Sequence, residues 1–282
     1  MHTLLIPFPG LNPVAFELGP LSVKWYGLAY LAGLLLGWLY IKRLLAQDSL
    51  WPGQRAPFAL AKADDLLLYM TVGVLLGGRL GYVLFYEPAY FLRNPGDIIA
   101  VWHGGMAFHG ALLGSILAIV LFARAQGANP WSVLDLCAAA TPMGLFFGRL
   151  ANFINGELWG RPTDVAWAMI FPHPASGGVP RHPSQLYEAA LEGLVLFLVL
   201  RYLTHSKLAL RNPGLVGGTF VAGYGIARST CELFREPDPG HWLTVGPLTA
   251  GIFYSLPMIV VGAWAIARAL RKAPQTPAHA GE

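Results

Sequence analysis

Ionisable side chains stand inside apolar stretches of this 282-residue chain, where they are costly and by default mark function. The first group occupies residues 148–160 and combines one guanidinium, two amides and one carboxylate: Arg149, Asn152, Asn155 and Glu157. A planar guanidinium binds two phosphate oxygens at once, and neighbouring amides supply neutral donors. This group therefore predicts a phosphate-binding site. The alternative is an arginine that reaches the membrane surface beside asparagines that cap a helix.

A second group consists of Tyr224, Arg228, Glu232 and Arg235. Their spacings of four, four and three residues place all four side chains on one face of a helix. One interpretation is a salt bridge between Arg228 and Glu232 within that helix. Because a buried pair must still offset its desolvation cost, we favour a functional role for this face.

The third group is the glycine-rich segment 102–110, which contains His109. Its glycines would let a ligand or another helix approach the backbone closely. A single histidine in a membrane span is equally often a hydrogen-bonded packing residue, so both interpretations stay open. Tyr26, His182 and the Glu188–Glu192 pair, which is spaced for one helix face, are further polar candidates.

The elements that must position these residues are membrane-spanning helices. Hydrophobic residues make up 55% of the chain and charged residues only 12%, about half the ~25% of a soluble domain. Mean hydropathy is +0.51. Seven apolar runs approach the ~20 residues that a spanning helix needs: Trp25–Leu45, Leu66–Tyr86, Gly104–Phe122, Val133–Leu150, Leu186–Tyr202, Gly214–Leu233 and Val245–Ala267. None alternates as a barrel strand would, so the sequence predicts an all-α integral membrane protein with seven transmembrane helices.

Lysine and arginine follow the first, third, fifth and seventh runs more often than the others. The positive-inside rule then places the N-terminus outside and the C-terminus in the cytoplasm. We expect residues 1–271 to form a single polytopic membrane domain, with small structured periplasmic elements at 1–24 and 161–185. Residues 272–282 should be a disordered cytoplasmic tail. The net charge of +4 needs no nucleic-acid partner, because the positive-inside bias accounts for much of it.

Small residues four apart occur in several runs, and such pairs usually allow helices to approach closely in lipid. They are Gly33/Gly37, Gly77/Gly81, Gly110/Gly114 and Gly144/Gly148. The sequence has no His-Glu-x-x-His, no Cys-x-x-Cys and no Asp-rich motif, so we expect neither a metal nor a cofactor. Phosphate chemistry in this chain would use arginine.

Several blocks resemble one known family, the prolipoprotein diacylglyceryl transferases. They are the segments 148–160, 103–110 and 180–188, Tyr224-Gly225 with Arg228 and Glu232, Trp25-Tyr26-Gly27, and the run 77–82. The blocks follow the family order from about residue 13 to about residue 260. Together they are far more specific than any one block.

The resemblance implies a bacterial inner-membrane enzyme whose partners are phosphatidylglycerol, the lipid bilayer and a prolipoprotein signal peptide with a lipobox cysteine. That cysteine would be the nucleophile, which fits the absence of a catalytic serine or cysteine motif. The resemblance implies that His109, Arg149 and Arg228 are essential. From the chemistry we assign His109 as the base and Arg149 and Arg228 to the charge on the departing phosphate; Glu232 or Glu157 could share the task of the base. Together with our own candidates, the expected substrate-binding residues are Arg149, Tyr26, Asn152, Asn155, Glu157, Gly160, His182, Tyr224 and Glu232.

Two other classes of membrane protein also hold charged residues within their spans or must be distinguished from an enzyme. A polytopic transporter of an anionic solute would also hold charges near the midplane of the membrane, but the sequence shows no evident inverted repeat. A structural scaffold would have no reason to concentrate arginine, histidine and asparagine inside the bilayer.

Overall fold

The computed structural model describes all residues except 1–5, 11, 238–243, 246–247 and 273–282, so the expected tail lies almost wholly outside the described residues. The longer helices are α1 (Trp25–Leu45), α2 (Ala63–Phe85), α3 (Pro88–Arg93), α4 (Phe108–Ala125), α5 (Pro130–Ile154), α6 (Ser184–Glu188), α7 (Leu196–Ser206), α8 (Leu215–Glu232) and α9 (Ala250–Lys272). A π-helical segment, Ala189–Val195, joins α6 to α7. Short 3-10 helices cover Asp48–Leu50, Pro52–Gln54, Leu60–Lys62, Pro95–Ile99, Val101–His103, Pro174–Ser176 and Ala209–Arg211.

Within the described residues, five helices are long and apolar enough to cross a membrane: Trp25–Leu45, Leu60–Phe85, Phe108–Ala125, Pro130–Ile154 and Ala250–Lys272. An α-helical membrane protein is therefore confirmed. The other two expected spans are also helical, as the continuous helix from α6 to α7 and as α8. Each carries buried charged residues, which lower its apolar character.

In the part of the chain that the structure describes, the strands form two short antiparallel pairs, which the expectation of an all-α chain did not include. Strand β1 (Val14–Leu18) pairs with β2 (Leu21–Lys24) directly before α1. Strand β3 (Thr244–Val245) pairs with β4 (Leu248–Thr249) directly before α9. The seventh run was thus predicted to become helical five residues too early, because Thr244–Val245 and Leu248–Thr249 are extended.

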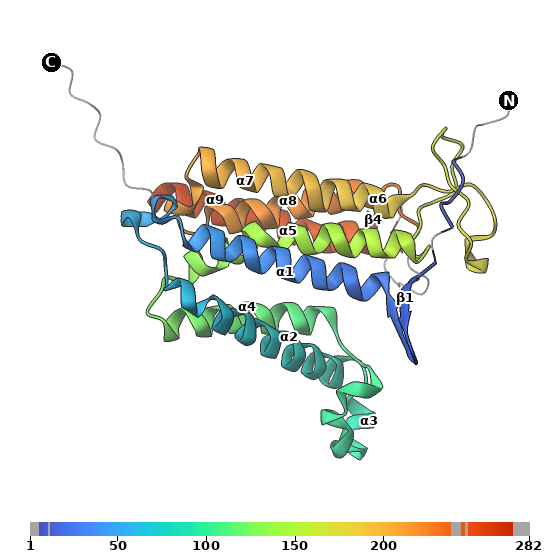
Figure 1. Cartoon of the computed structure of the whole chain (residues 1–282), viewed down its shortest axis with the longest axis horizontal. Coiled ribbons are helices and arrows are strands. Elements are labelled where there is room, and N and C mark those ends of the chain that lie inside the picture. The colour runs from blue at the N-terminus through green and yellow to red at the C-terminus, as the bar shows by residue number, and fades with distance from the viewer. Residues whose placement is uncertain (1–5, 11, 238–243, 246–247, 273–282) are drawn as a thin grey trace.

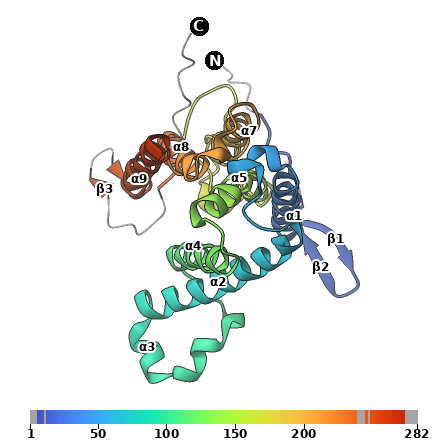
Figure 2. The ribbon, with the colours of Figure 1, turned by 90° about the vertical axis from the view of Figure 1, so that its left-hand side faces the viewer.

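Helix α5 lies at the centre of the bundle, between α1, α4, α7 and α8 (Figures 1 and 2). At the end where α1 finishes, large apolar side chains form a tight core that includes Leu44, Trp51, Phe122 and Leu136. Asp135 fixes α8 against α5, because its carboxylate accepts hydrogen bonds from Gly214 N at 2.7 Å and Gly217 N at 2.6 Å. These contacts set the position of the polar face of α8.

Helices α2 and α4 form an antiparallel hairpin that leans away from the main bundle, with α3 at its far end (Figure 1). Their contact is made by glycines: an added Cβ on Gly81 would lie 2.8 Å from Gly110 Cα. Likewise, a Cβ on Gly33 of α1 would lie 2.9 Å from Gly144 Cα of α5. Close packing is confirmed for these glycines. In the Gly144/Gly148 pair, by contrast, a Cβ on either residue would itself meet no atom within 4 Å.

Candidate active site

Arg149, near the C-terminal end of α5, is clamped by two buried carboxylates. Its Nε lies 2.8 Å from Glu188 Oε2, and its Nη2 lies 3.3 Å from Glu192 Oε2. Both glutamates are fully buried, whereas the Arg149 side chain keeps 18% of its surface exposed. One edge of the guanidinium is therefore held by protein while another part remains reachable.

Arg228 on α8 is bound to the same carboxylate. Its Nη1 lies 3.2 Å from Glu188 Oε1, and its Nη2 lies 2.7 Å from Glu232 Oε2, four residues further along the helix. Arg235 Nη1 lies 3.7 Å from Glu188 Oε1. Glu188 thus links three arginines from two segments that are far apart in sequence.

The cluster holds three guanidinium groups and three carboxylates, which we call the charge cluster: Arg149, Arg228, Arg235, Glu188, Glu192 and Glu232. Burial of so many charges is tolerated only when each is paired and hydrogen-bonded. Glu192 Oε1 is buried without a hydrogen-bond partner in the described part of the chain. The cluster is therefore balanced in charge but not fully satisfied in hydrogen bonds.

Local structure around Glu188 explains how this side chain reaches the centre. The π-helical segment begins directly after it and contains Glu192; π-helical turns are frequent at functional sites. Gly193 lets this segment lie against α5, since a Cβ there would come within 2.7 Å of Phe146 Cα. Both glutamates are thereby pressed towards Arg149.

Glu157 lies just after α5 and is held by two amides. Asn152 Nδ2 donates to Glu157 Oε1 at 2.8 Å, and Asn155 Nδ2 donates to the same oxygen at 3.3 Å. The backbone turns sharply here, with positive φ at Gly156 (66°) and at Leu158 (59°). Gln185 Nε2 donates to the carbonyl of Glu157 at 2.6 Å and so ties the turn to α6.

Gly160 permits a close backbone contact. A Cβ at this position would lie 2.5 Å from Phe234 O and 2.6 Å from His182 Cβ. Gly160 N donates to His182 O at 2.8 Å. We assigned Gly160 to substrate binding, and the geometry gives it a structural reason of its own: it brings segment 156–162 against the end of α8.

His182 lies in the wall next to this contact, with its ring 5.2 Å from that of Phe234. Its Nδ1 is 3.1 Å from the hydroxyl of Tyr187. Burial lowers the pKa of His182 from its usual value, which favours the neutral ring. Within the described residues, no hydrogen bond or ion pair joins His182 to the charge cluster.

Tyr26 on α1 and Tyr224 on α8 lie near the charge cluster. Tyr26, at the start of α1, hydrogen-bonds to Tyr30 at 3.1 Å and interacts electrostatically with Glu157 and Arg149. Tyr224 on α8 interacts electrostatically with Glu192 and Arg149. Both hydroxyls therefore belong to the same polar region.

His109 stands apart from the charge cluster. It is exposed in the first turn of α4, and its ring lies 5.7 Å from Tyr254 on α9. No hydrogen bond joins it to Arg149 or Arg228 in the described part of the chain. The structure thus brings Arg149, Arg228, Glu232 and Tyr224 together around Glu188 and Glu192, with Tyr26 approaching from α1. It places His182 in an adjoining wall and leaves His109 on the neighbouring hairpin.

The sequence analysis named Glu188 and Glu192 only as further polar candidates and Arg235 only as a member of the second group, and it included none of the three among the expected site residues. The available signal was two acidic residues four apart in a run that is otherwise apolar. Glu188 and Glu192 pair with Arg149 on α5 and Arg228 on α8. The spacing of residues along one helix cannot predict such pairs between helices. Among the described residues, no group of three or more His, Cys, Asp or Glu side chains is arranged to hold a metal ion.

A bundle of helices suited to a membrane, with paired arginines and carboxylates buried at one end of its central helix, defines a multi-helix membrane protein with a buried cluster of paired charges. The family model for prolipoprotein diacylglyceryl transferase matches residues 13–268, and the chain belongs to this family.

Curated relatives cover nearly the whole chain. A protein of Rhizobium leguminosarum bv. trifolii is 52% identical over 271 residues, covering 95% of both chains. One of Rhizobium meliloti is 54% identical over 271 residues, covering 94% of both chains. One of Mesorhizobium japonicum is 53% identical over 266 residues, covering 94% of this chain and 92% of the relative. All three carry the name phosphatidylglycerol–prolipoprotein diacylglyceryl transferase.

Proposed function

We propose that this chain transfers the diacylglyceryl group of phosphatidylglycerol to the lipobox cysteine of a prolipoprotein. The names of its relatives support the reaction. The observation that carries the assignment of the site is the linkage of Arg149 to Arg228 through Glu188. Because Glu188 holds both guanidinium groups close together, the two groups are well placed to bind the same phosphate.

The reaction makes one bond and breaks one. The cysteine sulfur attacks the glyceryl carbon that carries the phosphate, so a carbon–sulfur bond forms while the carbon–oxygen bond breaks. Glycerol phosphate leaves with the electron pair, and the thiol proton passes to a base. Thiols react as thiolates, so removal of this proton is part of the chemistry.

The arginines would stabilise the charge that grows on the departing phosphate. Within the described residues, the bonds of Arg149 use Nε and Nη2, and those of Arg228 use Nη1 and Nη2. Arg149 Nη1 and Arg228 Nε make none of these bonds, and each Nη that is bonded still carries a second N–H, so both guanidinium groups keep donors for a ligand. Asn152, Asn155 and Glu157, which brace one another beside Arg149, would complete the headgroup site together with Tyr26 and Tyr224.

His109 remains our proposed base. Its ring is exposed, as it must be to meet a thiol delivered by a second substrate. Glu232 is the second candidate for the base, although its carboxylate is already paired with Arg228 at 2.7 Å. No metal or cofactor enters this mechanism.

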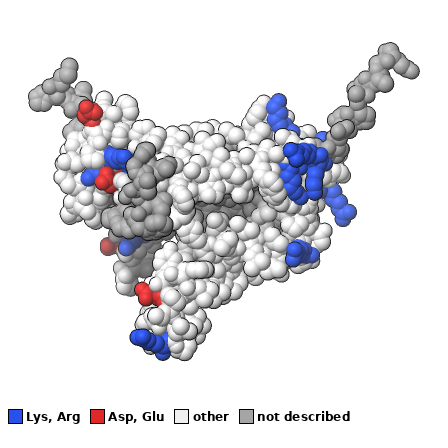
Figure 3. Space-filling view, turned by 180° about the vertical axis from the view of Figure 1, so that it is seen from behind, with Lys and Arg blue, Asp and Glu red and all other residues white. Residues whose placement is uncertain are grey.

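We also propose seven spans in a bacterial inner membrane, with the N-terminus periplasmic and the C-terminus cytoplasmic. Basic residues gather at the end of the bundle where α1 and α9 finish (Figure 3). Such an excess is typical of the cytoplasmic side. Between the two ends, the face in Figure 3 is a broad band without lysine, arginine, aspartate or glutamate, as lipid contact requires.

A transfer assay tests this function. Purified protein, phosphatidylglycerol and a lipobox peptide should yield a peptide whose mass has increased by one diacylglyceryl group. A peptide with serine in place of the cysteine is the control and should gain nothing. Lack of modification by a folded, lipid-reconstituted protein would contradict the proposal, and uptake of an anionic solute by the same vesicles would favour a transporter.

A further inference from the structure

The connection between α2 and α4 exposes large apolar side chains at its surface. We call this connection, residues 86–107, the paddle; it lies at the far end of the α2–α4 hairpin and contains α3 (Figure 1). Leu92 is 84% exposed, Ile99 75% and Trp102 73%. Phe85 and Phe108, which border the paddle, are also largely exposed. Water would be an unfavourable surrounding for so much clustered apolar surface.

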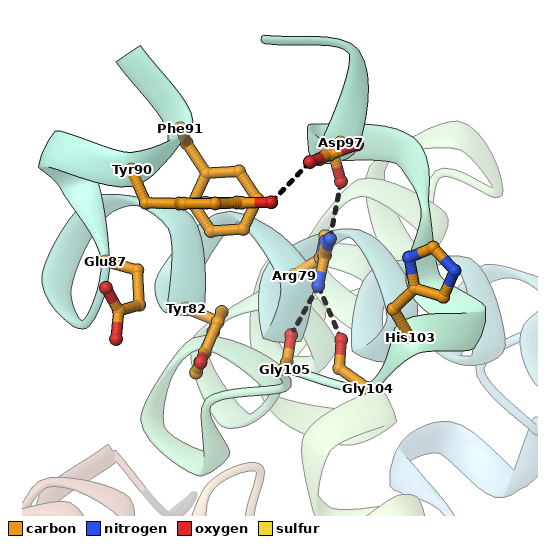
Figure 4. Close-up of a pocket in the computed structure, with 9 residues that line it drawn as sticks. All are labelled: Arg79, Tyr82, Glu87, Tyr90, Phe91, Asp97, His103, Gly104 and Gly105. Carbon is orange, nitrogen blue, oxygen red and sulfur yellow. Dashed lines mark hydrogen bonds between the residues drawn. The ribbon is translucent and has the colours of Figure 1, made fainter. Parts of the chain in front are cut away.

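Several polar side chains of the paddle line a pocket of about 330 Å³ (Figure 4), whereas Arg93 and Asn94 are exposed outside it. Its lining includes Glu87, Asp97 and His103, and none of the three most exposed apolar residues contributes to it. Tyr90 donates to Asp97 Oδ2 at 2.5 Å within this pocket. The two carboxylates of the paddle, Glu87 and Asp97, therefore lie apart from its exposed apolar groups. Arg93, beside Leu92, is exposed, and its long side chain can extend to the headgroups.

Arg79 holds the irregular backbone of the paddle in place. This residue of α2 is buried, and its guanidinium donates to five backbone carbonyls, of which those of Asp97, Gly104 and Gly105 appear in Figure 4. Nε donates to Ile98 O at 2.8 Å; Nη1 donates to Gly104 O at 2.5 Å and Gly105 O at 3.1 Å; Nη2 donates to Asp97 O at 2.6 Å and Ala100 O at 3.3 Å. All five N–H groups of the arginine are thereby used.

Backbone that is not helical can lie within the membrane only if its carbonyl groups accept hydrogen bonds from the protein. An unpaired carbonyl in lipid is costly, and irregular segments persist there only when protein covers their polar groups. Positive φ at Gly104 (84°) and Gly105 (79°) turns two of these carbonyls towards Arg79. The exposed faces of α2 and α4 continue without a break into the paddle through Leu84, Phe85 and Phe108.

We propose that the paddle is an interfacial anchor that lies in one leaflet of the bilayer, with Leu92, Ile99 and Trp102 among the acyl chains and the Glu87–Asp97 pocket facing water. Its partner is the lipid surface. Tryptophan suits this depth, because it favours the boundary between headgroups and hydrocarbon. Arg79 makes the arrangement possible by internally pairing the backbone.

Depth-dependent quenching tests this proposal on the full chain in phosphatidylglycerol–phosphatidylcholine vesicles. A polarity-sensitive fluorophore is attached at Ile99→Cys, at Trp102→Cys and, as matched control on the same paddle, at Glu87→Cys. Lipids labelled with a quencher near the headgroup should dim positions 99 and 102 strongly, while aqueous iodide should dim position 87. Cys137 and Cys231 are buried, and the unmutated protein gives their background labelling.

Iodide quenching of positions 99 and 102 equal to that of position 87, with no effect of labelled lipid, would overturn the proposal. So would efficient cross-linking between copies through Ile99→Cys, because a second chain would then cover this surface. Arg79→Lys, which cannot reach five carbonyls from one nitrogen, should raise iodide access at position 99. If Arg79→Lys does not accumulate, the comparison of positions 99 and 87 in the otherwise unmutated protein still decides the matter.

Discussion

At the scale of single residues, Glu188 is the side chain on which the charge cluster depends. It is fully buried and contacts Arg149, Arg228 and Arg235. Replacing Glu188 by Gln would leave three guanidinium groups short of one carboxylate. Removing one partner of a buried ion pair costs about 3–5 kcal/mol. We expect Glu188→Gln to lower the thermal midpoint of the purified protein and to abolish most transfer activity.

Glu17 provides the matched control for this substitution. It is exposed on β1, so Glu17→Gln should leave both the midpoint and the transfer rate unchanged. A Glu188→Gln protein as stable and as active as the unmutated one would show that the linked arginines do not need their shared carboxylate.

His109 is predicted to serve the thiol, and its substitution should have a distinctive pH dependence. His109→Gln removes the base but keeps a hydrogen-bonding side chain. Since a thiol with a pKa of about 8.5 ionises without help as pH rises, the residual rate should climb towards about pH 9 relative to the unmutated enzyme. Rates at saturating substrate from about pH 6 to about pH 9.5 measure this. If the rate of His109→Gln is reduced by the same factor at every pH, His109 is not the base and instead packs against Tyr254.

At the scale of elements, Gly160 controls how segment 156–162 meets the end of α8. Gly160→Ala would place a methyl group 2.5 Å from Phe234 O and 2.6 Å from His182 Cβ. We expect a loss of about 1–3 kcal/mol in stability from this overpacking, together with slower transfer. Gly27→Ala is the control, because a Cβ at Gly27 meets no atom within 4 Å. Equal thermal midpoints for the two variants would refute the close contact.

Individual helices could be predicted from the sequence better than the contacts between them. Hydrophobic runs located α1, α2, α4 and α5, because length and apolarity are local properties. The face formed by Tyr224, Arg228 and Glu232 was also predictable, since it needs only the helical period. The role of Glu188 was not, because it depends on a π-helical segment and on partners from α5 and α8. The paddle was missed for a similar reason: Arg79 acts through backbone carbonyls, which carry no residue signature.

At the scale of the whole molecule, the orientation in the membrane follows from the end where basic residues gather. Cysteines at Gln54 and Asp164, both exposed, should be labelled from opposite sides of intact cells by a membrane-impermeant reagent. We expect Asp164→Cys to react from the periplasm and Gln54→Cys only after permeabilisation. The reverse pattern would invert the proposed topology.

The central claim is that a guanidinium fork at position 149 holds the departing phosphate. Arg149→Lys keeps the charge but loses the planar fork that binds two oxygens. Loss of one such donor in a preorganised site costs roughly 100-fold or more in rate, and the defect should be the same at every pH because arginine does not titrate in this range. Arg124→Lys, at the exposed end of α4, should transfer at the unmutated rate.

The most direct test compares three proteins: the unmutated enzyme, Arg149→Lys and Arg124→Lys. It measures how fast each transfers the diacylglyceryl group to a lipobox peptide from about pH 6 to about pH 9.5. The account predicts a large, pH-independent defect for Arg149→Lys alone. An Arg149→Lys enzyme that matches Arg124→Lys across the range would contradict it.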